Sequence, residues 1–162
     1  MKKFLYLVIA LTCTFSFAAC GDDDVADTTL PVIDLDEPED GDELLIGAEV
    51  HFECDFSDNE MLGSYMIEIH SNFDGHTHKS PTRAGESFFF KKSYELTGLR
   101  NAHIHHHDIV IPENAAEGHY HLVVYCTDAA GNQSLVAREI IFSHDAEEHH
   151  HHHDGDDDDD ED

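Results

Sequence analysis

The sequence predicts an all-β domain. No segment behind the N-terminal apolar run keeps the 3.6-residue apolar period of a long helix. Short runs of alternating apolar and polar residues recur instead, and Gly, Pro, Asn and Asp separate them, as expected for strands joined by turns. The fold class therefore follows from the missing helical period, the period-two runs and the spacing of the turns.

Seven strands are expected. Val50, Phe52, Cys54 and Phe56 alternate on one face of the second strand, and the third and sixth strands alternate in the same way. The count suits an immunoglobulin-like antiparallel β-sandwich. In chain order the expected strands lie near Pro31–Leu35, Glu49–Phe56, Ser64–His70, Ser87–Tyr94, His105–Ile111, His119–Thr127 and Leu135–Phe142.

A disulfide between Cys54 and Cys126 is expected. The alternation points both side chains inward, from the second and sixth strands. In an immunoglobulin-like sandwich these strands lie in opposite sheets and face each other, where the inter-sheet disulfide of such domains lies. Closing so long a loop would contribute about 4 kcal/mol on the chain-entropy estimate.

The N-terminus resembles the signal of a bacterial lipoprotein. Lys2 and Lys3 precede a short apolar run, and the segment ends in Phe17-Ala18-Ala19-Cys20. The resemblance implies cleavage before Cys20, lipidation of that cysteine and anchoring in a membrane. The acidic residues behind it resemble an export tag for the outer face of the outer membrane, with the inner leaflet as the alternative.

Four segments follow from this interpretation. Residues 1–19 are the signal peptide, 20–27 an acidic linker, 28–143 the β-sandwich, and 144–162 a His/Asp-rich tail too charged to pack. The formal net charge of −28 argues against nucleic acid as a partner.

Two further stretches resemble known families. Gly118–Val124, running into Thr127–Asn132, is similar to the final hairpin of bacterial immunoglobulin-like domains. Phe56–Glu60 with Ile67–His76 resembles a family of envelope lipoproteins known only as a domain of unknown function. This second likeness covers about residues 28–143 and implies fold and location, but no activity.

Histidines are the chemically informative residues, because 16 of them stand against 8 Lys and Arg. Several form His-x-His pairs, and on a strand such a pair projects from one face about 6–7 Å apart. The pairs are His76/His78, His103/His105, His105/His107 and His119/His121.

A metal site is predicted on the outer face of the sheet that holds the third and sixth strands. Because these strands are antiparallel neighbours in this fold, His70 should approach His119 and His121. A turn at Asp74-Gly75 would let His76 and His78 fold back over them. The strand near residue 105 adds His105 and His107, with His103 further along, although it belongs to the other sheet.

Such an imidazole set suits zinc, with copper or nickel as alternatives. Glu68, Asp74 or Asp108 could add a carboxylate. His51 is interpreted as ordinary surface, and His106, which points away from its neighbours, as a residue filling a polar position.

A separate, low-affinity collector of divalent ions is expected in the tail, where histidines stand beside a run of carboxylates. The tail histidines expected to bind metal are His149, His150, His151, His152 and His153.

Three functions remain open. The leading hypothesis is a non-enzymatic, lipid-anchored surface protein that captures, buffers or takes up zinc, with an outer-membrane transporter or surface protein as a partner. The first alternative is an adhesion or assembly module, which the adjacent aromatics Phe88-Phe89-Phe90 favour because they cannot all face the core. The second is a zinc-dependent hydrolase with Glu68 or Asp108 as its base.

Overall fold

A computed structural model describes residues 26–72 and 85–147 of the chain. Both ranges are built of strands and turns, and neither holds a helix long and apolar enough to span a membrane. The expected signal peptide and Cys20 lie outside the described residues. The strands are β1 (Val32–Glu37), β2 (Glu43–Leu45), β3 (Glu49–Ser57), β4 (Leu62–Ser71), β5 (Phe89–Glu95), β6 (Asn101–Val110), β7 (Gly118–Asp128) and β8 (Gln133–Ser143).

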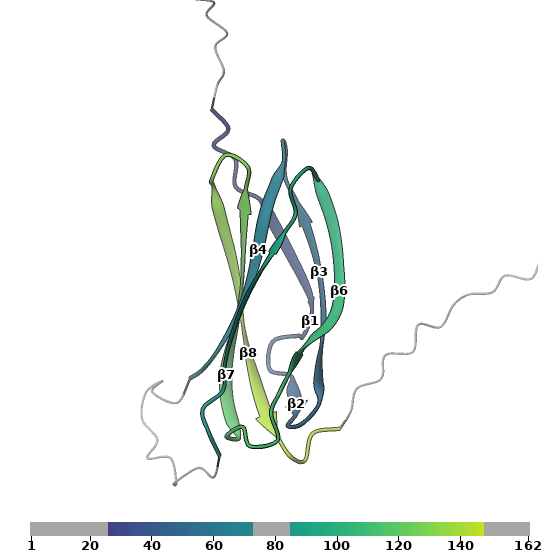
Figure 1. Cartoon of the computed structure of the whole chain (residues 1–162), viewed down its shortest axis with the longest axis vertical. Helices are drawn as coiled ribbons and strands as arrows, with labels where there is room; N and C mark the ends of the chain where they lie inside the picture. Colours follow the sequence, from purple (N-terminus) through teal and green to yellow (C-terminus); the bar gives the residue numbers. More distant parts are fainter. Residues whose placement is uncertain (1–25, 73–84, 148–162) are drawn as a thin grey trace, which may run out of the picture.

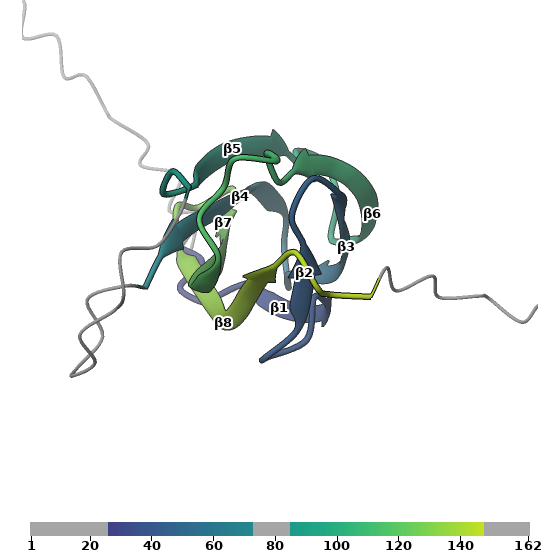
Figure 2. The same cartoon turned by 90° about the horizontal axis from the view of Figure 1, so that it is seen from below.

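The strands form two sheets that face each other. One sheet has the order β1-β3-β6, and the other has the order β2-β8-β7-β4-β5. Figure 1 shows the strands running along the long axis, and Figure 2, from below, shows the two sheets curving around a common core. The predicted all-β sandwich is confirmed, and its strand order is that of an immunoglobulin-like domain.

The core follows from the alternation seen in the sequence. Along β3 every second residue from Val50 to Phe56 is buried, and β7 contributes Tyr120, Leu122, Val124 and Cys126 from the facing sheet. The side chains between them project outward, so each sheet has an outer face that carries polar residues. The chemistry of the molecule therefore lies on these two outer faces.

Tyr120 anchors the start of β7. Its ring is fully buried and stacks on Phe142 with the ring centroids 4.0 Å apart. Its hydroxyl donates a hydrogen bond of 2.8 Å to the carbonyl oxygen of Ala116, four residues upstream. A buried tyrosine must satisfy its hydroxyl, and this bond to the preceding corner is typical of immunoglobulin-like sandwiches.

The main differences from the predicted strands are an added strand and an earlier start of β6. β2, which has three residues, was not predicted, and it pairs in parallel with β8 in a sandwich expected to be antiparallel. Three residues are too few to show an alternation, so the sequence carries no signal for this strand. β6 begins at Asn101 rather than at His105, which brings His103 into the same strand as His105 and His107.

The predicted disulfide is wrong, because Cys54 and Cys126 are free thiols. Both are fully buried, as expected, and the Cys54 thiol instead lies 3.8 Å from the carbonyl oxygen of Asp55. Burial raises the pKa of both thiols, that of Cys126 to about 11. The thiolate needed for disulfide formation is therefore disfavoured in this apolar core.

The three adjacent phenylalanines divide between two environments. Phe88 and Phe90 pack against the core, and Phe88 lies 5.7 Å from Phe142 between ring centroids. Phe89 points the other way and is 63% exposed. One exposed ring on the edge strand β5 does not form an extended apolar patch.

Candidate metal site

The outer face of the three-stranded sheet carries histidines and carboxylates from two adjacent strands. On β3 the outward residues are His51, Glu53 and Asp55, which alternate with the buried core residues. β6 lies antiparallel to β3 and brings its own outward residues beside them, with Glu53 opposite His105 and Asp55 opposite His103. The pairing of β3 with β6 thus joins two segments about fifty residues apart in sequence into one polar surface.

A β-bulge interrupts the pairing of β3 with β6 at His107. Val50 pairs with Ile109, but the next pair is Phe52 with His106. Two residues of β6, His107 and Asp108, therefore stand opposite the single residue His51. His107 is two residues from His105, so it projects on the same side as His105 and His51.

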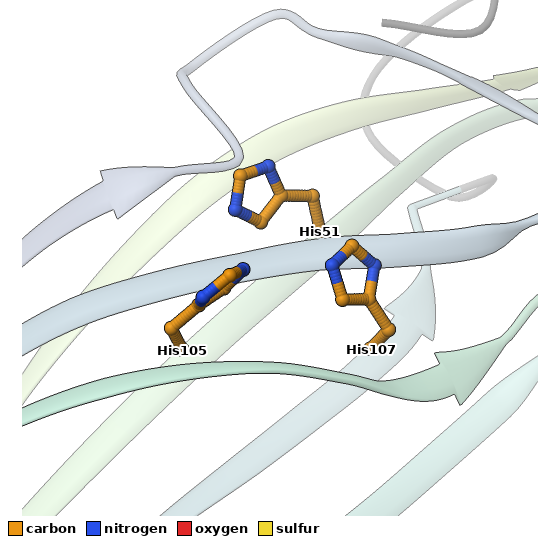
Figure 3. A group of neighbouring side chains, drawn as sticks. All are labelled: His51, His105 and His107. Atoms are coloured by element: carbon orange, nitrogen blue, oxygen red, sulfur yellow. The ribbon is translucent and has the colours of Figure 1, made fainter. Parts of the chain in front are cut away.

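The three imidazoles converge. Each of His51, His105 and His107 offers one ring nitrogen, and these three nitrogen atoms all lie within 4.8 Å of one another. The ring centroids are 4.8 Å apart for His51 and His105, 5.1 Å for His51 and His107, and 5.4 Å for His105 and His107. Figure 3 shows His51, from β3, facing the two rings of β6.

These three side chains can bind a transition metal. Three imidazoles are the protein ligands of many zinc sites, and copper and nickel accept the same donors. Ligand atoms around a tetrahedral zinc lie about 3.4 Å apart, so closing the 4.8 Å group needs only small side-chain rotations. His105 and His107 are exposed and His51 is partly buried, which leaves room for that movement and access for the ion.

Carboxylates lie beside His51 and beside His103 on the same face. Glu53 lies 3.6 Å from His51, measured between Oε2 and Nε2, and Asp55 lies 3.1 Å from His103, measured between Oδ1 and Nδ1. Asp36 lies beside them on β1. Burial raises the pKa of Asp36 most, and repulsion from Asp34, Asp55 and Glu53 raises it further. The repulsion shows that this face has a negative potential, which attracts cations.

A cavity opens beside His51. Its wall includes Leu44, Leu45, Ala48 and Pro38 together with several carboxylates and the end of the described chain at Glu147. A divalent cation approaching His51 from this side therefore passes a negatively charged rim. The acidic residues of the lining are Glu37, Glu39, Asp42, Glu43, Glu49 and Glu147.

The histidines predicted to form the site on the other sheet are brought together only in part. His70 and His121 are paired across β4 and β7, with ring centroids 5.5 Å apart. His119 instead contacts Glu139 on β8, at 3.0 Å between Nδ1 and Oε1. His70, His119 and His121 therefore do not converge as a three-ligand group. Among residues 26–72 and 85–147, the three imidazoles that do converge are those of His51, His105 and His107.

Some of the predicted ligands cannot be placed relative to these groups. Asp74, His76 and His78 lie outside the described residues. The same is true of the predicted metal-binding residues of the tail, which are His149, His150, His151, His152 and His153.

His51, interpreted from sequence as ordinary surface, is instead the centre of the imidazole group. The signal that could have found it is the pairing of the second and fifth predicted strands. That pairing places His51 beside the His105/His107 pair.

His106 points away from its neighbours, as the sequence predicted. Its ring stacks between Phe52 and Tyr94, with centroid distances of 4.9 and 5.2 Å. Burial lowers the pKa of His106, so the neutral ring is favoured in this aromatic environment. It acts as a packing residue beneath the outer face.

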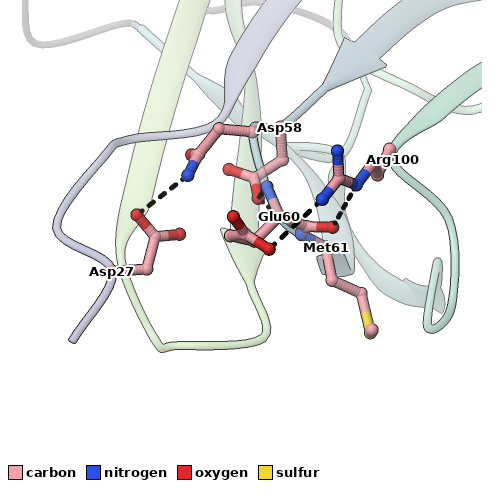
Figure 4. A network of polar contacts seen from close by, with 6 residues as sticks. Asp27, Asp58, Glu60, Met61 and Arg100 are labelled. Atoms are coloured by element: carbon pink, nitrogen blue, oxygen red, sulfur yellow. Dashed lines mark hydrogen bonds and ion pairs between the residues drawn. The ribbon is translucent and has the colours of Figure 1, made fainter. Parts of the chain in front are cut away.

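A second group of potential ligands consists of Asp27, Asp58 and Asp128, of which Figure 4 shows the first two. Its hydrogen bonds have a structural role, because Asp58 Oδ1 accepts from the backbone N–H groups of Glu60 and Met61. Asp128 accepts from the backbone and the side chain of Asn132. These bonds hold the β3–β4 and β7–β8 turns.

Comparison with known proteins identifies a family without a described function. The family model described as "Domain of unknown function (DUF4625)" matches residues 18–143, which is most of the chain. No curated protein matches the chain. The function must therefore be inferred from the chemistry of the outer faces.

Proposed function

We propose that this chain, which belongs to the domain-of-unknown-function family DUF4625, is a lipid-anchored envelope protein. It binds a divalent transition metal, and zinc is the first candidate. The ion is bound by His51, His105 and His107 on the outer face of β3 and β6. Lipidation at Cys20 places this face at the surface of the outer membrane, where the protein captures or buffers the ion or passes it to a transporter.

The observation that carries the proposal is the convergence of three imidazoles from two strands. A single His-x-His pair is common on exposed strands and needs no metal to explain it. A third imidazole, brought to within 4.8 Å by the pairing of β3 with β6, is the usual protein complement of an open zinc site. Glu53 beside His51 supports it, because its carboxylate brings a negative charge and an oxygen donor to the edge of the imidazole group.

The surroundings favour binding rather than hydrolysis. Glu68, one of the two bases considered for a hydrolase, lies on β4 in the other sheet and forms an ion pair with Lys91. Asp108 forms an ion pair of 2.7 Å with Lys92, which lowers its pKa and its basicity. A protein that holds or delivers the ion needs neither base.

The test is zinc calorimetry on the full chain with His149–His153 replaced by alanine, so that the tail does not contribute. Replacing His51, His105 and His107 together by alanine should weaken zinc binding at least hundredfold, since each ligand of a zinc site contributes a few kcal/mol. All three side chains are on the outer face, so the variant should keep its circular dichroism spectrum. Unchanged zinc affinity in the variant, or no tight binding in the parent, would refute the proposal.

A further inference from the structure

Glu53 lies between two imidazoles that point at different oxygens of its carboxylate. Its Oε2 atom is 3.6 Å from Nε2 of His51, and its Oε1 atom is 3.6 Å from Nε2 of His103. The Glu53 side chain is 25% exposed, whereas that of His103 is 56% exposed. Glu53 is therefore more deeply placed than His103, between the two rings.

Both nitrogen–oxygen distances match the separation between two ligand atoms that bind one metal ion. A hydrogen bond between nitrogen and oxygen spans about 2.7–3.2 Å, so 3.6 Å is too long for a good one. Zinc bonds of about 2.0–2.2 Å and a tetrahedral angle place two ligand atoms about 3.4 Å apart. An ion placed between Glu53 and His103 would need almost no movement of these two ligands, whereas Glu53 lies outside the group of His51, His105 and His107 and must turn toward it to share the first ion.

His103 is oriented for this role by a second carboxylate. Its Nδ1 atom lies 3.1 Å from Oδ1 of Asp55, and a carboxylate can only accept, so Nδ1 carries the proton. In neutral imidazole Nε2 then carries the lone pair, and it faces Glu53. A carboxylate bonded to the far nitrogen is the usual partner of a metal-binding histidine.

We propose that the outer face of β3 and β6 holds two metal ions bridged by Glu53. The first ion is bound by His51, His105, His107 and Oε2 of Glu53, and the second by Nε2 of His103 and Oε1 of Glu53, with water completing its shell. This inference rests on the proposed function, because the first ion is the one described above. The negative potential from the neighbouring aspartates of β1 and β3 offsets the repulsion between the two cations.

The competing explanation is that both contacts are ordinary surface ion pairs of protonated histidines. The molecule supplies a matched example in His119, whose Nδ1 atom lies 3.0 Å from Oε1 of Glu139. This pair is within hydrogen-bond distance, and no other imidazole shares Glu139 within the described part of the chain. His119→Ala is therefore the control for loss of a surface pair.

The first experiment counts zinc ions by calorimetry and elemental analysis on the full chain with alanine at positions 149–153. The parent should bind two zinc ions per chain, and His103→Ala should bind one, with the tighter site retained. Glu53→Gln should lose the second ion and weaken the first about ten- to hundredfold. His119→Ala should bind two ions, like the parent.

The second experiment uses Cu²⁺ as the probe and electron paramagnetic resonance as the readout. Two copper ions bridged by one carboxylate are close enough to give a dipole-coupled spectrum with a half-field transition. Glu53→Gln and His103→Ala should each remove the coupled signal and leave that of an isolated Cu²⁺ ion. Loss of a mere surface pair would not produce this change.

The outcomes separate the two proposals. One zinc ion, lost on replacing His51, His105 and His107 but unaffected by His103→Ala, would overturn the two-ion inference and leave the proposed function standing. Two ions without magnetic coupling, or two ions retained in Glu53→Gln, would overturn the bridge. Absence of tight zinc binding in the parent would overturn both.

Discussion

The His-x-His motifs of β6 and β7 are alike in sequence but differ in their surroundings. Each places its middle residue inward, His106 against two aromatic rings and Tyr120 in the core. On β6 the flanking pair meets a third imidazole, His51, across a bulge. On β7 one member, His119, contacts a carboxylate of β8, and the other, His121, meets a single imidazole from β4.

The difference shows that strand partners, rather than motif spacing, decide where three imidazoles can meet. In a regular strand the members of a His-x-His pair project from one face about 6–7 Å apart, so both can reach one ion, but a third imidazole must come from a neighbouring strand. The bulge of β6 puts His107 and Asp108 opposite His51, and His105 lies further along, opposite Glu53, so the rings of His105 and His107 both lie near His51. On the β7 side, Glu139 contacts the His119 member of the pair, and Glu68 forms an ion pair with Lys91.

The largest effect is expected from removing one motif at a time. Replacing His105 and His107 by alanine, in the chain with an alanine-substituted tail, should weaken zinc binding at least hundredfold, because two of the three imidazole ligands are lost. Replacing His119 and His121 should change the affinity less than threefold. Competition with a chromophoric chelator measures both, and equal losses in the two variants would erase the distinction between the faces.

Acid should release the ion from the imidazole site. Only neutral imidazole binds a metal, so lowering the pH from 7 to 5.5 should weaken zinc binding at least tenfold. The measurement is a zinc titration at each pH, with the His105/His107 variant as the control that shows no such step. Zinc held equally tightly at both pH values would indicate carboxylate ligands instead.

A smaller effect is expected from the residue that supports the bulge. Asp108 binds Lys92 at 2.7 Å and lies 3.4 Å from the hydroxyl of Tyr94. Asp108→Asn removes the exposed ion pair and should loosen the bulge, weakening zinc binding by up to about fivefold. Lys91→Ala, which breaks the Glu68 ion pair on the other face, is the matched control and should leave zinc affinity unchanged.

The smallest effect concerns the charge of the β3/β6 face. The folded-state pKa of Asp36 is raised by burial and by repulsion from neighbouring carboxylates, so its ionised form destabilises the native state above the unfolded pKa. Asp36→Asn should therefore increase the free energy of unfolding at pH 7 by a few tenths of a kcal/mol. Urea unfolding should show this gain disappearing below about pH 4, where the carboxyl is protonated in both states. A loss of stability at pH 7 would contradict a repulsive environment.

Much of the fold was predictable because burial imposes an alternation that the sequence displays. The runs through Phe52, Ile67 and Val124 each have a buried face, and they locate three of the central strands. The free thiols of Cys54 and Cys126 were not predictable from their inward direction, because direction does not fix whether two buried thiols are oxidised. β2 lacked a signal because its pairing with β8 is set by backbone contacts over three residues.

The sequence predicted that histidines would form the site, but it did not predict on which face of the sandwich they meet. The sequence identified His105 and His107 as ligands, but it could not show the bulge, since His105-His106-His107-Asp108 reads as regular alternation. His51 was missed because its environment is created by a strand that follows about fifty residues later. A contact between strands so far apart leaves no trace in the local pattern of either one.

Anomalous diffraction at the zinc absorption edge, from crystals of the full chain grown with zinc, would locate the ion directly. If the β3/β6 face binds zinc, a strong anomalous peak is expected between His51, His105 and His107, with Glu53 at its edge. A peak between His70 and His121 without one at the β3/β6 face, or no peak on either face, would contradict this expectation.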